Sequence, residues 1–385
     1  MRVATKAIIS GVHDTKVGAL PESTCMSLHA QAGMGAIRDA GLQVGDIDGL
    51  LTAYSFTSPQ IMLGAVAAEY IGLKPKVNAS ISMGGVTAGL MVAHAVALVK
   101  AGMCRHVLCL TGDNRLTGLG EKVQEALAQV GHQQYERPYG MSVASGFALA
   151  AQAYMHEFGM THEHMAAVAV TLRASAAKHP NAHMKKPISM DDVRNSRMIA
   201  SPLRMLDCCL VSDGGAAVIV SAGDVARDLP KTAIEILGVG EGHTHEHLFM
   251  APSLVDFGCR ESAAAALGQA GLSAGDVDSA HVYDCFTSTL LICLESMGFY
   301  DHGAAGEAAL AGEFAIDGRF PVNTNGGLMS YGSSGAAGGM FHVVEAVRQL
   351  RHECGDRQVR NSSVALAHTL GGIFSAHCSI VMGRS

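Results

Sequence analysis

Tryptophan is absent from this chain of 385 residues, and charged residues make up only 16% of it. Lys and Arg number 27 against 34 Asp and Glu, so the formal net charge is −7 at pH 7. Because there is no long basic run, binding to nucleic acid is not expected. No apolar stretch reaches the roughly 20 residues that cross a bilayer, so no association with a membrane is expected either.

Disulfide and secretion signals are also missing. The first residues, MRVATKAIISGV, lack the longer apolar segment and the cleavage site of a secretory signal. The ten cysteines are scattered without a Cys-x-x-Cys pair, and Cys208 and Cys209 are adjacent, which is a poor arrangement for a disulfide. We therefore expect free, mostly buried thiols and a cytoplasmic location.

What the sequence does contain is an internal repeat. AGLQVGDIDGLLTAYSF at 40–56 matches AGLSAGDVDSAHVYDCF at 270–286 without a gap, and each reads as a helix end, a turn and a strand. Two looser pairs follow in the same order: AGLMVAHAVA at 88–97 with AGGMFHVVEA at 337–346, and HVLCLTGD at 106–113 with SVALAHTL at 363–370. Three ordered matches predict an α/β protein made of two similar units, each with a mostly parallel sheet covered by helices.

The repeat predicts three parts of the chain. The N-terminal half takes residues 1–115 and 206–225 and closes with the buried strand SDGGAAVIVSA at 212–222. The C-terminal half takes residues 230–385. Residues 116–205 form a long inserted loop region, rich in Met, His, Arg and Lys, that contains helical stretches such as SGFALAAQAYMHEF.

Several motifs resemble those of the thiolase superfamily over nearly the whole chain. They are DGGAAVIV at 213–220, YDCF at 283–286, NTNGG at 323–327 and a final Gly-Gly turn at 371–372. The most similar branch is related to the sterol-carrier-protein thiolases, whose usual motif at the YDCF position is HDCF. The resemblance implies two packed βαβαβαββ halves in αβαβα layers and a homodimer. It also implies a coenzyme A thioester as substrate, with no permanently bound cofactor.

In that family a cysteine nucleophile sits in a Cys-x-x-Gly turn at a helix N-terminus. The matching turn here is Ser82-Met83-Gly84-Gly85, so Ser82 stands at the position of the nucleophile. A serine hydroxyl needs an adjacent base to attack. We expect Ser82 to cap the helix that follows; a nucleophile and a hydroxyl that contacts substrate are the alternatives.

The histidine that activates the cysteine is also replaced. The usual Gly-His-Pro segment corresponds to Tyr331-Gly332-Ser333-Ser334-Gly335, with one residue fewer, and Ser333 stands where the histidine would be. The expected structure is a compact Gly/Ser turn. The functional alternative is a backbone oxyanion site with a hydroxyl beside it.

The position of a further acid/base residue is closer to the family's usual motif. Cys285 matches the cysteine of HDCF, and Tyr283 replaces its histidine; a tyrosine can donate a hydrogen bond to a developing oxyanion. The structural alternative is a strand end with Phe286 in the core and Asp284 capping a helix. His368 falls where many thiolases carry another catalytic cysteine, although a lone histidine is more often structural.

The resemblance leaves three functions open. The first is an enzyme of the acyltransferase (thiolase) family that makes or breaks C–C bonds in coenzyme A thioesters without the usual cysteine nucleophile. In a retro-aldolase form it would cleave a β-hydroxyacyl-CoA with a small zinc-ribbon/OB-fold partner, and Tyr283, Tyr331 and His368 would be the candidates. The second is a non-catalytic acyl-CoA or lipid-binding protein, and the third is a structural subunit.

Ligand contacts are predicted less directly. Charge alone points to Lys185, Lys186 and Arg194 for the phosphates of coenzyme A, and the resemblance to Gly326 and Gly327 of NTNGG.

Two other patterns are weighed and set aside. His243, His245 and His247 alternate, so on a strand they would share one face and could bind a metal ion. A loop at the mouth of a pocket is the favoured interpretation, and no metal is expected. GVGEG at 238–242 lacks the complete glycine pattern of a dinucleotide loop.

Overall fold

The computed structural model describes residues 6–119, 127 and 130–384. A nine-stranded sheet runs in the order β3-β2-β4-β7-β1-β8-β11-β10-β9, and β5 and β6 form a small separate sheet. The strands are β1 (Ala7–Asp14), β2 (Gly49–Ala53), β3 (Val77–Ile81), β4 (His106–Asn114), β5 (Met198–Ala200), β6 (Leu203–Arg204), β7 (Asp213–Ala222), β8 (Ile234–His243), β9 (Ser279–Val282), β10 (Val364–Gly371) and β11 (Ala376–Arg384).

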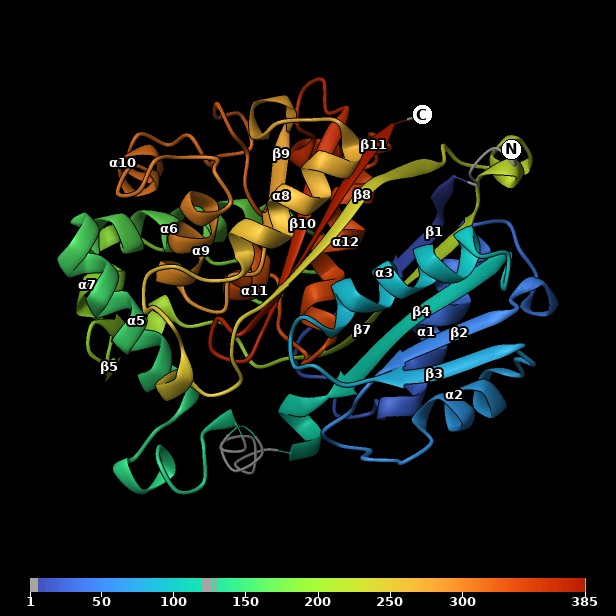
Figure 1. The fold of residues 1–385 in the computed structure, drawn as a ribbon, viewed down its shortest axis with the longest axis horizontal. Helices are drawn as coiled ribbons and strands as arrows, with labels where there is room; N and C mark the ends of the chain where they lie inside the picture. The colour runs from blue at the N-terminus through green and yellow to red at the C-terminus, as the bar shows by residue number, and fades with distance from the viewer. Residues whose placement is uncertain (1–5, 120–126, 128–129, 385) are drawn as a thin grey trace.

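The helices cover both faces of this sheet. They are α1 (Cys25–Asp39), α2 (Leu63–Ile71), α3 (Thr87–Lys100), α5 (Val143–Phe158), α6 (His162–Ala177), α7 (Met190–Asn195), α8 (Cys259–Ala270), α9 (Thr287–Ser296), α10 (Ala305–Leu310), α11 (Gly327–Ser330) and α12 (Ala337–Leu350). In Figure 1 the N-terminal half, in blue, lies beside the C-terminal half, in orange and red. The green helices α5, α6 and α7 lie against the C-terminal half.

The sheet is two similar sheets joined edge to edge. In the N-terminal half β2 pairs in parallel with β3 and β4, and β7 is antiparallel to β4 and β1. In the C-terminal half β9 and β10 are parallel, and β11 is antiparallel to β10 and β8. The halves meet where β1 pairs with β8, at Ile8↔Glu235 and Ile9↔Ile234. The predicted duplicated α/β architecture is confirmed.

The gapless sequence match corresponds to one connection used twice. In the first half α1 leads to β2 through a 3₁₀ turn, Val44–Asp46, and in the second α8 leads to β9 through Ala274–Asp276. In each turn the aspartate accepts a backbone N–H three residues back, from Gln43 at 2.7 Å and from Ser273 at 2.8 Å. The same side-chain cap therefore explains why Gly-Asp recurs in both copies.

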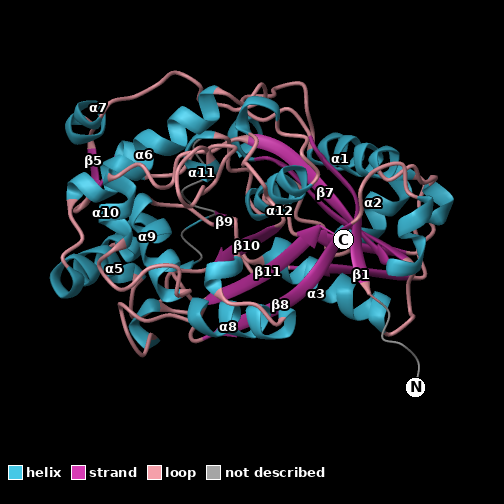
Figure 2. Cartoon of the chain, turned by 90° about the horizontal axis from the view of Figure 1, so that it is seen from above, coloured by secondary structure: helices cyan, strands magenta, loops and turns pink. Residues whose placement is uncertain are grey.

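Three packed clusters give the layers. One joins α1 and α2 to the outer face of the N-terminal strands. The largest packs α8 and α9, with the inserted helices α5 and α6, on the outer face of the C-terminal strands. Between the two halves, α3 and α12 pack on each other and on the strands of both. Figure 2 shows α8 against β8 and β11. The result is the expected αβαβα order.

The glycines of GVGEG allow β8 and α8 to pack closely. A Cβ added at Gly238 would lie 2.0 Å from the carbonyl oxygen of Ala266, and one at Gly240 would lie 2.1 Å from that of Ser262. The segment is therefore a strand packed on a helix, with no room for side chains at these positions.

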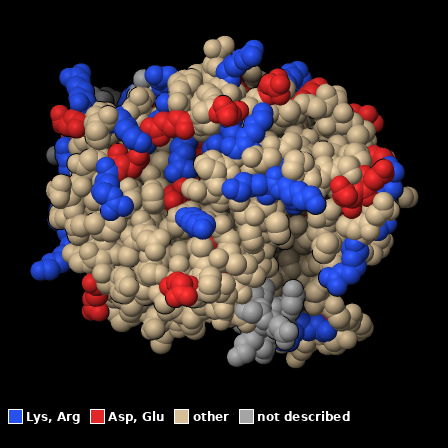
Figure 3. All heavy atoms as spheres, turned by 180° about the vertical axis from the view of Figure 1, so that it is seen from behind, with Lys and Arg blue, Asp and Glu red and all other residues tan. Residues whose placement is uncertain are grey.

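The cysteines and the charged surface residues are arranged as the composition suggests. All ten cysteines are free, eight of them buried, which confirms the prediction of free thiols. On the face shown in Figure 3, acidic and basic side chains are interspersed. Within the described part of the chain, no helix has both the length and the apolar character needed to cross a membrane.

Candidate active site

A cavity of about 410 Å³ lies where loops of both halves meet. The lining residues discussed below come from the ends of β2, β3, β4, β9 and β10 and from loops: Tyr54, Phe56, Ser82, Gly85, Arg115, Glu246, Tyr283, Cys285, Gly335 and Leu370. Carboxyl ends of strands and the loops after them are the usual place for a ligand in α/β proteins.

Ser82 lines the cavity but does not cap a helix. Helix α3 begins at Thr87, its N-cap is Val86, and that end has no side-chain cap. Instead the Thr87 hydroxyl accepts the N–H of Met83 at 2.9 Å and donates to the Gly84 carbonyl at 2.7 Å. The cap prediction is wrong, because four residues separate Ser82 from the first helical residue. Over the described residues, no base contacts the Ser82 hydroxyl, so nothing there activates it for attack.

The Tyr283 hydroxyl lies directly against this turn. A Cβ added at Gly85 would lie 2.2 Å from the Tyr283 Oη, so Gly85 makes room for the phenol. Burial raises the pKa of Tyr283 well above its ordinary value, and the nearby Cys285 and Cys209 thiols add to this rise. The phenol is therefore protonated at neutral pH and can donate a hydrogen bond.

Cys285 lies beside Tyr283 in the cavity wall. Its thiol is 3.7 Å from the Thr289 hydroxyl, and it is 8% exposed. Burial, and then the neighbouring Cys209, raise its pKa well above the usual value. The thiol is therefore neutral, which suits a proton donor better than a nucleophile. The YDCF motif thus brings two of the predicted site residues into the same wall.

The rest of that motif is structural. Phe286 is 5% exposed and packs on Phe147 with ring centroids 4.8 Å apart. The Asp284 carboxylate accepts the N–H of Leu328 at 2.8 Å and of Met329 at 3.3 Å. Asp284 therefore caps α11 across space, whereas α9, the helix that follows it, has no side-chain cap. The structural expectation for these two positions is confirmed.

His368 lies in the core, away from the cavity lining. Its Nε2 is 3.0 Å from Nδ1 of His377 on the neighbouring strand, and it is fully buried. Burial, then His377, lower its pKa well below the usual value, so the imidazole is neutral. Leu370, two residues further along β10, lines the cavity instead.

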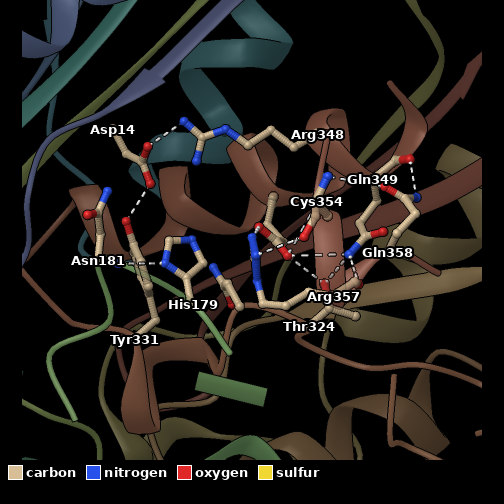
Figure 4. A network of polar contacts seen from close by, with 12 residues as sticks. Asp14, His179, Asn181, Thr324, Tyr331, Arg348, Gln349, Cys354, Arg357 and Gln358 are labelled. Carbon is tan, nitrogen blue, oxygen red and sulfur yellow. Dashed lines mark hydrogen bonds and ion pairs between the residues drawn. The ribbon is translucent and has the colours of Figure 1, made fainter. Parts of the chain in front are cut away.

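Tyr331 is not among the described residues that line the cavity, and Figure 4 shows its hydroxyl pointing toward Asp14. Its hydroxyl donates to Asp14, which accepts a second hydrogen bond from Arg348 at 2.5 Å. Burial alone would raise the pKa of Asp14, but Arg348 and Tyr331 hold it below its ordinary value. Tyr331 therefore belongs to a buried polar network that ties α11 and α12 to β1.

Tyr331→Phe is expected to lower the free energy of unfolding by about 2 kcal/mol, because a buried carboxylate loses a hydrogen bond. Turnover should stay within a few-fold of the wild-type rate, since Tyr331 does not line the cavity. Urea unfolding and steady-state kinetics measure the two effects. A large fall in kcat with unchanged stability would show that Tyr331 acts on substrate.

Ser333 forms part of the expected compact turn. Its carbonyl accepts the N–H of Ser212 at 2.9 Å, and its own N–H donates to the Ser212 hydroxyl at 3.3 Å. Ser333 is 4% exposed, and Gly335 is the residue of this loop that lines the cavity. The position of the usual histidine is therefore filled by a turn held to the start of β7.

Two charged residues of the cavity lining were not predicted from the sequence. Arg115, directly after β4, lines the cavity at 8% exposure, with its guanidinium carbon 5.3 Å from the centre of the Phe56 ring. Glu246, in the loop after β8, is an exposed residue of the lining. A charged residue just after a buried strand was the available signal for Arg115. Glu246 lies inside the segment HTHEH at 243–247, where the alternating histidines gave the stronger sequence signal.

The residues predicted to contact coenzyme A have other neighbours here. Lys185 donates to the Pro180 carbonyl at 2.8 Å, and Arg194 donates to Asp191 at 2.9 Å. These two and Lys186 are not among the described residues that line the cavity. Contacts between them and coenzyme A remain a prediction.

Gly326 and Gly327 open α11 with φ of +102° and +61°. A Cβ at Gly327 would lie 2.0 Å from a carboxylate oxygen of Asp284, so glycine is needed for the cap described above. Both glycines are buried and stand outside the described cavity lining, and contact between them and coenzyme A also remains a prediction.

Metal-ligating side chains converge at one place in the described residues, and this cluster includes none of the alternating histidines. Atoms of Cys259, Cys293 and His377 lie within 4.8 Å of one another in the core. Both His377 nitrogens already have hydrogen-bond partners, His368 at 3.0 Å and the Phe374 carbonyl at 3.1 Å. The cluster is therefore satisfied as a set of hydrogen-bonded core groups.

The chain is similar to several known proteins in sequence and in structure. A family model described as Thiolase C-terminal domain-like matches residues 240–384. An acetyl-CoA acetyltransferase of Methanothermobacter thermautotrophicus is 31% identical over 369 residues, covering 94% of this chain and 96% of that protein. A steroid side-chain-cleaving aldolase of Thermomonospora curvata is 33% identical over 365 residues, covering 90% of each. The solved Ltp2-ChsH2(DUF35) aldolase superposes with a TM-score of 0.88 at 30% identity, covering 98% of both chains.

Proposed function

The chain belongs to the thiolase superfamily, in the branch of the sterol-carrier-protein thiolases, and on that premise we propose that it cleaves a C–C bond in a β-hydroxyacyl-CoA by a retro-aldol reaction. The observation that carries the proposal is the turn at Ser82. It has no cysteine, no base contacts it among the described residues, and the protonated Tyr283 hydroxyl lies against it. This arrangement suits stabilisation of an enolate better than formation of an acyl-enzyme.

In the proposed reaction, Glu246 takes the proton of the β-hydroxyl, and the oxygen lone pair forms the new C=O bond. The electrons of the Cα–Cβ bond pass to the thioester, whose enolate oxygen accepts the hydrogen bond of Tyr283. The neutral Cys285 thiol returns a proton to Cα, and solvent restores the protonation of both groups. The products are a shortened acyl-CoA and an aldehyde or ketone.

Intact-mass measurement after incubation with an acyl-CoA tests the absence of a covalent step. We expect no acyl adduct, together with release of a carbonyl product from a β-hydroxyacyl-CoA, which liquid chromatography detects. An adduct on Ser82 would contradict the proposal and support the thiolase reaction, with Ser82 in the place of the nucleophile.

A partner protein, self-association and location complete the proposal. One similar structure is described as a complex with a DUF35 protein, which supports a small partner of the zinc-ribbon/OB-fold kind. We propose the same for this chain, as a homodimer in the cytoplasm, where its free cysteines would stay reduced. Co-expression with a DUF35 protein, followed by purification and light scattering, tests the partner and the dimer.

A further inference from the structure

Within the described part of the chain, Arg115 is a buried cation without a counter-ion. It is 8% exposed, and no carboxylate pairs with it over residues 6–119, 127 and 130–384. The other buried arginines have polar partners: Arg351 pairs with Asp39 at 2.7 Å and Arg357 with Glu345 at 3.1 Å. Arg173 has no carboxylate but donates to the Ser330 hydroxyl at 2.8 Å and to the Lys186 carbonyl at 3.2 Å. Burying an unpaired charge costs free energy, so Arg115 calls for another explanation.

The acids next to it in sequence are already satisfied. Asp113 accepts the N–H of Phe56 at 2.7 Å and the Ser55 hydroxyl at 3.1 Å. Asp213 accepts the N–H groups of Leu20 at 2.9 Å and Leu116 at 2.7 Å. These carboxylates are therefore held by backbone and hydroxyl donors and leave Arg115 unpaired.

The cavity wall holds the guanidinium in place. It stacks over Phe56 at 5.3 Å, and a Cβ added at Gly335 would lie 3.2 Å from the Arg115 Cδ. Gly335 has φ of +74° and belongs to the loop that has lost the usual histidine. A stacked, pre-positioned guanidinium is the side chain best suited to bind a planar carboxylate through two hydrogen bonds.

We propose that Arg115 binds a carboxylate carried by the acyl part of the coenzyme A thioester. The inference rests on the proposed function, because it assumes that the thioester lies against Tyr283 and Cys285, which line the same cavity. The phosphates of coenzyme A are separated from the thioester by the pantetheine arm, so they do not reach the reacting end. The substrate class is therefore a dicarboxylic acyl-CoA.

Succinyl-CoA and butyryl-CoA test this directly, because their acyl chains are of equal length and end in a carboxylate or a methyl group. Calorimetry at equilibrium with the complete protein, and with its partner if one co-purifies, should show tighter binding of succinyl-CoA by ten-fold or more. Arg115→Gln should remove this preference while leaving butyryl-CoA affinity unchanged. Arg115→Lys should restore part of it, since the charge returns without the planar fork.

Arg319→Gln is the matched control. Arg319 also stacks on an aromatic ring, Tyr300 at 5.5 Å, but it pairs with Glu313 at 2.5 Å and lies outside the described cavity lining. The preference for succinyl-CoA should be unchanged in this variant.

Equal affinities in the wild type, or a preference that persists in Arg115→Gln, would overturn the inference and leave the proposed reaction intact. An equal fall in the kcat of Arg115→Gln for β-hydroxyacyl-CoA esters with and without a terminal carboxylate, with no preference in binding, would mean that Arg115 serves the enolate instead. Failure to bind both succinyl-CoA and butyryl-CoA would overturn both proposals. A preference in binding without C–C cleavage of any β-hydroxyacyl-CoA would overturn only the reaction.

Discussion

Replacing Tyr283 with phenylalanine is expected to lower kcat by about 10²- to 10³-fold, with KM for the thioester changed by no more than a few-fold. The phenol lies against the Ser82–Gly85 turn, and burial keeps it protonated. Its hydrogen bond should strengthen as the enolate oxygen gains charge. The loss should therefore fall on the transition state, because the uncharged carbonyl of the bound substrate gains much less from the same donor.

Tyr331→Phe is the control for this variant, because it removes a buried phenol outside the cavity lining. The two variants should separate cleanly. Tyr283→Phe should lose rate while keeping its unfolding midpoint, and Tyr331→Phe should lose stability while keeping its rate. Steady-state kinetics and urea unfolding on the same preparations measure both. An unchanged kcat for Tyr283→Phe would remove this tyrosine from the reaction.

The fold was predictable because its signals are local and occur twice. The Ala-Gly-Leu helix ends, the capping Asp46 and Asp276 and the strands after them depend on neighbours within a few residues. Two copies of each signal separate a duplication from chance. The pairing of β1 with β8 was not predictable in this way, because it joins strands more than 200 residues apart.

The site was predictable only where a motif fixes the backbone. Tyr283 and Cys285 lie on one strand end, alternate in direction with the capping Asp284, and so reach the same wall. His368 and Tyr331 belong to comparable motifs, but their side chains point to His377 and Asp14. Which way a side chain points from a strand end or a turn depends on packing that the motif does not encode.

Arg115 and Glu246 could not be identified as cavity residues from the sequence. They lie in separate halves of the repeat scheme, Arg115 in the π-helical turn directly after β4 and Glu246 in the loop after β8. Only the folded chain places them around the same cavity. The residues that most distinguish this cavity therefore come from the least regular segments, as is common for binding loops carried on a rigid scaffold.

Glu246→Gln is expected to lower kcat by about 10²- to 10⁴-fold, the range that a positioned general base supplies. A carboxylate can accept the proton of a β-hydroxyl, whereas the amide of the same shape cannot. Stopped assays of the carbonyl product measure the effect.

Glu241→Gln provides the matched control, since Glu241 is an exposed carboxylate on β8 that pairs with His243 at 3.1 Å and lies outside the described cavity lining. Its rate should equal that of the wild type. Glu246→Asp should recover part of the lost rate, because the base returns on a shorter side chain. If Glu246→Gln kept the wild-type rate, the proton of the β-hydroxyl would have to leave by another route, and solvent or a partner protein would supply the base.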